Sequence, residues 1–364
     1  MRKILLIISL FFSVAAFAQD SYTIKGEVVD GVQSGDTLYL MSNLTAVPKV
    51  ESMAVVKNGR FSFSGALTEP LYSAIISFEE NRVLRRAELF IEKGIVNVKI
   101  GEQGYAVKGT FLNDRLQQYR DSIAPMIAIY DKYASKIAAA DITPAAYEEA
   151  RKVMLVTSLA RAEYAEKYLR KNIDNAVALC VIRENYELFS PVKGLELLSL
   201  LPLDMQEEPT AAKIKEYYKG ALRAAEGASF IDTRLSDTKG SIRNLADFVG
   251  KGKIVILNFW SSSNAASVKE QQQLRVMQQN SRDRIVAVGI SLDTNPVDWL
   301  KTIKEKNLPQ IQLTDGKGWG SAPVALYGVN SNPYSIVIDG NGTIRKRCTT
   351  ASEALNFVNA ILNK

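Results

Sequence analysis

The chain has 364 residues, of which 47% are hydrophobic and 23% charged, which is the composition of a globular protein rather than a disordered, collagen-like or multi-span membrane protein. Its 45 basic and 39 acidic residues leave a small positive excess, which does not indicate nucleic-acid binding. Histidine is absent, and cysteine occurs only at Cys180 and Cys348. These counts exclude imidazole catalysis, histidine-containing or cysteine-only zinc sites and a disulfide scaffold, so we expect neither a metal nor a cofactor.

The N-terminus has the pattern of a signal peptide. Arg2 and Lys3 precede the apolar run 4–12, and Ala16 and Ala18, on either side of Phe17, form a small-residue cleavage motif. The apolar run is shorter than the ~20 residues that a membrane-spanning helix needs. We therefore expect residues 1–18 to be removed near Ala18, the mature protein to have no stable membrane span, and its location to be the periplasm or cell envelope.

Residues 19–108 are expected to form an antiparallel β domain, either a small sandwich or a barrel. Asn58 and Gly59 lie between two alternating runs and predict a hairpin with a type I′ turn, because both central residues of that turn need a positive φ. No catalytic constellation is found in this region. The predicted strands cover residues 22–29, 37–41, 52–56, 60–63, 73–78, 87–91 and 95–100.

Residues 109–227 have a helical pattern. Cys180 lies in the apolar run 176–182, where a cysteine usually behaves as a small buried hydrophobic residue. Other apolar and aromatic side chains recur at helical spacing and are expected to belong to the core rather than to a ligand site. They are Val153, Val156, Ala160, Tyr164 and Tyr168.

Residues 228–364 alternate between strands and helices. Buried strands are predicted at 254–259 and 285–291, each followed by a helix, and then a hairpin over 335–348. A capping box from Thr350 to Glu353 opens the last helix. Parallel strands joined by a crossover helix and followed by an antiparallel pair form a thioredoxin-like α/β/α order. The expected fold class is therefore α+β multidomain, with a β domain, a helical middle region and a thioredoxin-like domain.

Four motifs in residues 228–364 resemble the thioredoxin-like proteins of the bacterial envelope, the TlpA/ResA and alkyl-hydroperoxide-reductase/thiol-specific-antioxidant (AhpC/TSA) superfamily. They are GKIVILNFW at 252–260, VGISLD at 288–293, YGV at 327–329 with NPY at 332–334, and IDG at 338–340. The segments 22–26, 59–65 and 90–94 resemble a domain of unknown function that often precedes such domains. The resemblance implies the fold of thiol-disulfide oxidoreductases and a cis-proline, Pro333, at the border of a groove.

The sequence departs from this family at the redox motif. After the tryptophan the family carries two cysteines, two residues apart, where a helix begins, and the matching positions here are Asn264 and Ser267. The reaction needs a thiolate that attacks a disulfide sulfur, and neither an amide nor a hydroxyl group replaces it. The peroxidatic cysteine of the same superfamily is also missing. We therefore expect no catalytic residue, and we expect Cys180 and Cys348 to be buried free thiols.

Other family features remain around the motif. Asn264 is the expected N-cap of the following helix. Glu270 matches a glutamate that the family often carries three residues after its second cysteine, and we interpret it as a first-turn carboxylate that complements the helix macrodipole. For Trp260 and Tyr334, contact area in the groove and a position partly in the core both stay open. The candidate groove comprises Trp260, Ser263, Asn264, Glu270, Asn332, Pro333 and Tyr334.

These observations predict an exported, redox-inactive protein that binds another protein or an extended peptide, or acts as a scaffold. A strand that enters a cis-proline leaves backbone groups available for pairing with an extended peptide, and helix N–H groups beside the serines at 261–263 suit an anion. Two alternatives remain, namely an envelope thiol-disulfide oxidoreductase and a subunit that modulates a partner oxidoreductase.

Overall fold

The computed structural model describes residues 21–29, 34–42, 49–67, 71–79, 82–101, 104–137, 143–281, 283–308, 311–349 and 351–362. The chain divides into two compact units, Met1–Val181 and Ile182–Lys364. The predicted signal peptide and Thr350 of the predicted capping box lie outside the described residues. Within these ranges, no helix combines the length and apolar character that crossing a membrane requires.

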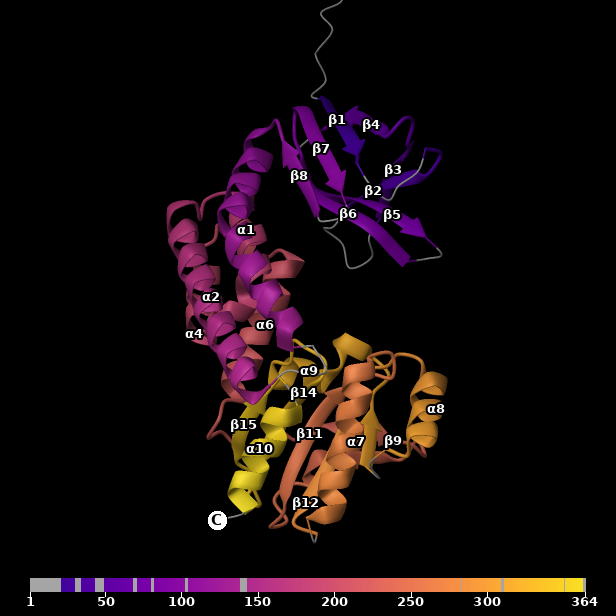
Figure 1. Cartoon of the computed structure of the whole chain (residues 1–364), viewed down its shortest axis with the longest axis vertical. Helices are drawn as coiled ribbons and strands as arrows, with labels where there is room; N and C mark the ends of the chain where they lie inside the picture. Colours follow the sequence, from indigo (N-terminus) through magenta and orange to yellow (C-terminus); the bar gives the residue numbers. More distant parts are fainter. Residues whose placement is uncertain are drawn as a thin grey trace, which may run out of the picture. The chain divides into compact units, whose positions relative to one another are not determined.

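The first unit begins with two four-stranded sheets, ordered β4-β1-β7-β8 and β3-β2-β5-β6 (Figure 1). Side chains from both sheets, including Ile24, Leu38 and Phe63, share one buried core, which confirms the predicted β domain. The strands are β1 (Ser21–Val28), β2 (Thr37–Ser42), β3 (Lys49–Val55), β4 (Arg60–Ala66), β5 (Leu71–Glu79), β6 (Arg82–Ile91), β7 (Gly94–Gly101) and β8 (Gly104–Lys108).

Strand pairing in this domain differs from the prediction. β1 pairs in parallel with β7, so the domain is not purely antiparallel, and β8 was not predicted. The positive φ values predicted for Asn58 and Gly59 are confirmed, 51° and 71°, but β3 and β4 pair with other strands and do not form the predicted hairpin. This turn leads from β3 in one sheet to β4 in the other, so it connects the two layers of the sandwich.

Helices α1 (Phe111–Ile137) and α2 (Pro144–Lys171) pack as a hairpin (Figure 1). Tyr164 and Tyr168 of the predicted stripe lie against Tyr119 of α1, with ring centroids 6.0 and 4.9 Å away. Val156, however, is 58% exposed, so the N-terminal half of the stripe is not core. The buried positions of α2 are Ala150, Thr157, Ala165 and Leu169, because contact with α1 rather than periodicity alone selects the buried face.

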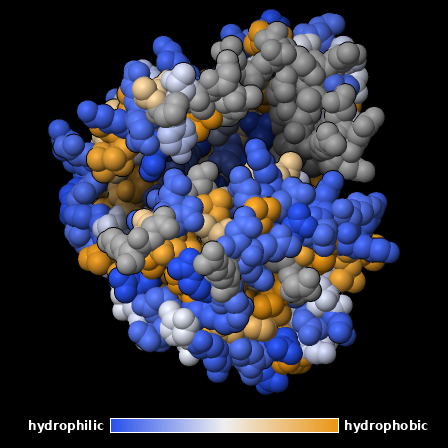
Figure 2. Space-filling view, turned by 60° about the horizontal axis from the view of Figure 1, so that its bottom comes forward, coloured by the Kyte–Doolittle hydropathy of each residue, from blue (hydrophilic) through white to orange (hydrophobic). Residues whose placement is uncertain are grey.

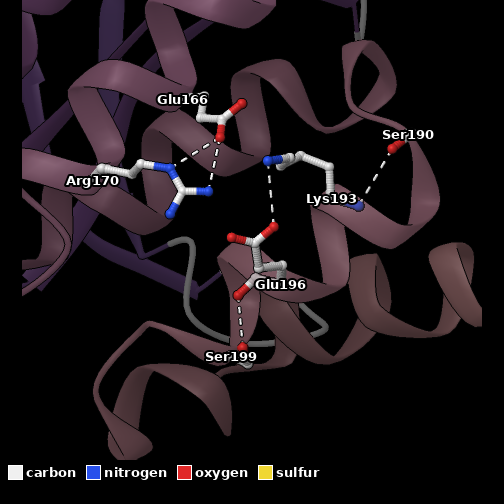
Figure 3. A network of polar contacts seen from close by, with 6 residues as sticks. All are labelled: Glu166, Arg170, Ser190, Lys193, Glu196 and Ser199. Atoms are coloured by element: carbon white, nitrogen blue, oxygen red, sulfur yellow. Dashed lines mark hydrogen bonds and ion pairs between the residues drawn. The ribbon is translucent and has the colours of Figure 1, made fainter.

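Helix α3 (Ala176–Asn185) buries Cys180, as predicted, and leads into the second unit. There η1 (Tyr186–Leu188), α4 (Pro191–Ser199), α5 (Leu203–Gln206) and α6 (Pro209–Arg223) precede the C-terminal sheet. Helix α4 begins after Ser190, whose Oγ accepts a hydrogen bond from the Lys193 N–H (3.3 Å). Lys193 pairs with Glu196 across one turn at 3.4 Å (Figure 3). These two local contacts stabilise the start of α4.

The second unit contains a seven-stranded sheet of order β10-β9-β13-β12-β11-β14-β15. β11 runs parallel to β12 and antiparallel to β14, which confirms the predicted thioredoxin-like order. The short strands β9, β10 and β13 were not predicted. The strands are β9 (Arg234–Asp237), β10 (Ile242–Asn244), β11 (Ile254–Trp260), β12 (Ile285–Ser291), β13 (Ile311–Thr314), β14 (Tyr334–Ile338) and β15 (Ile344–Cys348).

Helices cover this sheet and set its two cores. α7 (Ala265–Asn280) and α10 (Ala351–Leu362) pack over the face that carries Ile256, Val337 and Cys348 (Figure 1). The opposite face buries a larger apolar cluster that includes Leu257, Phe259 and Tyr327. The remaining helical elements are η2 (Leu245–Asp247), α8 (Pro296–Lys306), η3 (Gly318–Gly320) and α9 (Ala322–Tyr327). On the surface seen in Figure 2, apolar side chains form separate patches between hydrophilic ones.

Candidate functional site

Asn264 holds the redox-motif segment in place from two sides. It is the N-cap of α7, because its Oδ1 accepts hydrogen bonds from the N–H groups of Ala266 (2.9 Å) and Ser267 (3.2 Å). Its Nδ2 donates to the carbonyl of Asn332 at 2.8 Å. The Asn332–Pro333 peptide bond is cis, as predicted. The first lost-cysteine position therefore joins the helix to the cis-proline segment.

Ser267, at the second lost-cysteine position, is fully buried. Its Oγ lies 3.0 Å from the Ser261 carbonyl oxygen and 2.9 Å from the Asn264 carbonyl oxygen, and it accepts from the Ser261 N–H at 3.2 Å. These contacts close the turn between β11 and α7 on itself. Both positions thus carry polar side chains that stabilise the loop, and neither presents a nucleophile.

The serines of this turn bind a carboxylate that belongs to the protein itself. Asp293, just after β12, accepts from the N–H and Oγ of Ser262 at 3.0 and 2.8 Å and from Ser261 Oγ at 3.2 Å. The N–H groups of Ala266 and Ser267 are bound by Asn264. The expected anion site is therefore wrong, because the groups that would bind an anion already have acceptors and Asp293 would repel it.

The aromatic residues of the candidate groove lie in the core. Trp260 is 0% exposed and Tyr334 is 7% exposed, so neither offers contact area to a ligand. Trp260 packs with Trp299 and Leu308 instead. Ser263 is exposed, and Asn332 is partly buried beside the cis bond. Of the two alternatives left open by the sequence, burial in the core holds for both aromatic residues.

A row of polar side chains crosses the sheet beneath α7. Neighbouring strands place five residues side by side in register, in the order Gln312, Gly289, Asn258, Ser335 and Cys348. A Cβ atom at Gly289 would lie 2.2 Å from Oε1 of Gln312, so only glycine lets the Gln312 side chain lie across β12.

A chain of hydrogen bonds, each donated to the next residue, links this row to Trp260 on β11 and Gln271 on α7. Trp260 Nε1 donates to Gln312 Oε1 at 2.9 Å, and Gln312 Nε2 donates to Gln271 Oε1 at 2.8 Å. Gln271 then donates from Nε2 to Oδ1 of Asn258. All four side chains are buried, so each bond replaces solvation that the groups have lost.

The chain of hydrogen bonds ends at Glu270. Asn258 Nδ2 donates to Ser335 Oγ at 2.9 Å, and Ser335 Oγ donates to Glu270 Oε1 at 2.9 Å. Glu270 is 2% exposed, and its Oε2 has no hydrogen-bond partner among the described residues. Burial raises the pKa of Glu270 to about 7, against the lowering effect of the Ser335 hydrogen bond. The macrodipole interpretation is wrong, because α7 begins at Ala265 and Glu270 points inward from its second turn.

The two cysteines are free and buried, as predicted. Burial, together with the nearby Glu353 carboxylate, raises the pKa of the Cys348 thiol to about 12. A thiol with such a pKa is almost entirely protonated near neutral pH and is a poor nucleophile.

Comparison with known proteins identifies two parts of the chain. Residues 227–347 match the AhpC/TSA family. The part of the second unit that carries this match, called the AhpC/TSA domain below, has the thioredoxin-like strand order described above. Residues 22–116 match a domain of unknown function, DUF4369. None of the proteins with curated descriptions matches the chain.

Several solved structures are similar to the AhpC/TSA domain. The thioredoxin domain of a thiol-disulfide oxidoreductase from Bacteroides vulgatus is 24% identical, with a TM-score of 0.34, and the match covers 38% of this chain and 98% of that one. A thiol-disulfide oxidoreductase from Bacteroides fragilis is 21% identical, with a TM-score of 0.34 and coverages of 36% and 98%. An uncharacterized thioredoxin-like protein from Bacteroides vulgatus is 28% identical, with a TM-score of 0.33 and coverages of 37% and 87%.

Most of the polar row and the role of the Asp293 carboxylate could not be predicted from the sequence. One signal was present, because Asn258 interrupts an otherwise apolar strand of the AhpC/TSA domain, and a buried polar residue requires partners. The burial of Gln271 and Gln312 could not be predicted, because their neighbours in the sequence do not distinguish a buried glutamine from an exposed one.

Proposed function

We propose that the AhpC/TSA domain is a redox-inactive binding module of the cell envelope that docks an extended segment of a partner protein beside Pro333. The observation that carries this proposal is the use of both lost-cysteine positions, Asn264 and Ser267, as hydrogen-bonding groups that close the motif loop. Export is supported by the signal-peptide pattern of residues 1–18.

The proposed docking surface offers fewer backbone groups for pairing than a thioredoxin-like groove in which both the N–H and the carbonyl before the cis-proline are free. The carbonyl of Asn332 already accepts from Asn264, so an incoming strand would pair with the Asn332 N–H, which no described residue binds. Pairing of a single backbone group gives weak binding, which we expect in the micromolar range or weaker.

Reductase and peroxidase assays test the loss of redox chemistry. Purified mature protein should neither reduce insulin with a dithiol donor nor reduce peroxide, because no thiol lies at the N-terminus of α7. The variant with both Cys180→Ser and Cys348→Ser is the matched control. Turnover above that control would establish the oxidoreductase alternative and refute the proposal.

An NMR titration tests the docking step. A synthetic extended peptide with alternating apolar residues should shift the amide signals of Asn332 and Tyr334. Asn264→Ala frees the Asn332 carbonyl and should strengthen binding, whereas Ser263→Ala, an exposed neighbour, should not change it. Unmoved Asn332 signals in the presence of a bound peptide would place docking elsewhere.

A further inference from the structure

A preformed cleft of about 800 Å³ lies in the second unit, between α6 and the segment around η3 and α9. Its apolar wall includes Tyr186, Tyr217, Trp319, Val324 and Val329. The helix α6 lies outside the residues that match the AhpC/TSA family, so the match covers only one wall of this cleft. Its volume lies within the ~300–1,000 Å³ that small-ligand sites occupy.

The cleft has rigid walls because two glycines let main chains touch. A Cβ atom at Gly220 would lie 2.1 Å from the Ala325 carbonyl oxygen, and one at Gly328 would lie 2.3 Å from the Ala221 nitrogen. Arg347 then donates to the carbonyls of Ala224 (2.8 Å) and Gly328 (2.9 Å), which ties the ends of α6 and α9 together. A ligand therefore meets a site that needs little ordering.

Aromatic side chains dominate the surface that a ligand would contact. Trp319 is 52% exposed, an unusual state for the largest apolar side chain. Tyr186 and Tyr217 meet edge to face, with ring centroids 5.2 Å apart. Tyr217 Oη accepts from Asn330 Nδ2 at 3.3 Å, and no described residue accepts the Tyr217 proton, so the phenol can donate to a carbonyl of the ligand.

One charged group at the rim of the cleft has no partner. Glu216 pairs with Lys219 at 2.8 Å, and the Glu187 carboxylate next to the cleft accepts from the Tyr186 hydroxyl at 3.1 Å. Lys213, also at the rim and exposed, has no ion-pair partner among the described residues. Lys213 therefore offers a partner to an acidic group next to the apolar part of a ligand.

We propose that this cleft binds an extended peptide segment in which an aromatic residue stands next to an acidic one. The aromatic ring lies against Trp319 and Tyr217, a peptide carbonyl accepts from the Tyr217 hydroxyl, and the carboxylate lies near Lys213. The inference rests on the proposed function and deepens it, because Asn330 in the cleft is two residues from Asn332 at the cis bond. One extended segment can reach both places.

Calorimetric titration of the full mature chain tests this proposal with three end-blocked peptides. They carry Phe-Asp, Phe-Lys or Ser-Asp at the centre of one shared sequence. The Phe-Asp peptide should bind in the micromolar range and the other two more weakly. Trp319→Ala should weaken Phe-Asp binding at least tenfold, since truncated aromatic anchors cause the largest losses at interfaces. Lys213→Ala should weaken it about two- to fivefold, and Lys215→Ala, on the same helix outside the cleft, should leave it unchanged.

Equal affinity of the three peptides, an unchanged affinity in Trp319→Ala, or equal effects of the two lysine substitutions would overturn the proposal. Phenylacetate that binds as tightly as the Phe-Asp peptide would identify a small-molecule site and also overturn it. The amide signal of Asn332 separates the two proposals. If binding depends on Trp319 and the Asn332 amide signal does not shift, the peptide binds in the cleft and docking at the cis bond is refuted. If the Asn332 amide signal still shifts in the Trp319→Ala variant, the peptide docks at the cis bond and the cleft proposal is refuted.

Discussion

Glu270 makes the stability of the AhpC/TSA domain depend on pH through one buried carboxyl group. Its raised pKa, from the ordinary 4.5 to about 7, means that the folded domain prefers the protonated form. At ~1.4 kcal/mol per pH unit, this difference corresponds to about 3 kcal/mol between the two protonation states. The energy comes from desolvation, because Oε2 has no described hydrogen-bond partner and the side chain is 2% exposed.

The direction of the effect follows from proton binding. Between about pH 4.5 and pH 7 the unfolded chain has lost the proton that folded Glu270 keeps, so stability falls as the pH rises. This contribution is fully present below pH 4.5 and is lost as the pH passes through about 7. Glu270→Gln keeps the acceptor for Ser335 and removes the charge. We expect the variant to exceed the wild-type free energy of unfolding by less than about 1 kcal/mol near pH 5 and by about 3 kcal/mol at pH 8.

Denaturant unfolding followed by tryptophan fluorescence measures this difference. All three tryptophans of the chain, Trp260, Trp299 and Trp319, lie in the AhpC/TSA domain, so the signal reports that domain. Glu216→Gln is the control, because the hydrogen bond from Lys219 lowers the pKa of this exposed carboxyl, which is the opposite direction from Glu270. If the free energies of unfolding of the wild type and Glu270→Gln change in parallel with pH, the assignment of the pH dependence to Glu270 is refuted.

Three further predictions concern the same domain. Asn264→Ala should lower its free energy of unfolding by about 1–2 kcal/mol through loss of the N-cap, and fluorescence-detected unfolding equal to the wild type would contradict this. Gly289→Ala should cost about 1–3 kcal/mol, because its Cβ displaces the Gln312 side chain, whereas Gly320→Ala, which faces open space, should be nearly neutral in the same assay. Cys348 should resist a thiol reagent at pH 8 in the native protein, and denatured, non-reduced protein should titrate two thiols per chain; fewer than two would indicate a disulfide.

Features with a local cause could be predicted from the sequence. Asn264 caps α7 through N–H groups two and three residues away, and the order of β12, β11, β14 and β15 follows from the alternation of elements. The cis state of Pro333 came from family resemblance rather than from its immediate neighbours. Periodicity gave the helix α2 but not its buried face, because contact with α1 decides which side faces inward.

Features that depend on strand register could not be predicted. Trp260 and Gln312 are 52 residues apart in the sequence. They meet because strand register places Gln312 of β13 beside Gly289 of β12, which in turn lies beside Asn258 of β11, the strand that also carries Trp260. The inward direction of Glu270 follows from the start of α7 and from Ser335 on β14. From the sequence alone, an acidic residue near the start of a helix predicts an interaction with the helix macrodipole, which is why the sequence places Glu270 in the first turn.

The main-chain contact between α6 and α9 determines where the second unit can be cut without damage. A fragment that begins at residue 227, where the family match begins, would lose α6 and expose the backbone of Gly328 and the carbonyl of Ala325 to water. It would also remove Ala224, whose carbonyl binds Arg347. A fragment from Ile182 onward retains all of these contacts. Limited proteolysis should therefore spare the 182–226 segment, which belongs to the folded domain rather than to a linker.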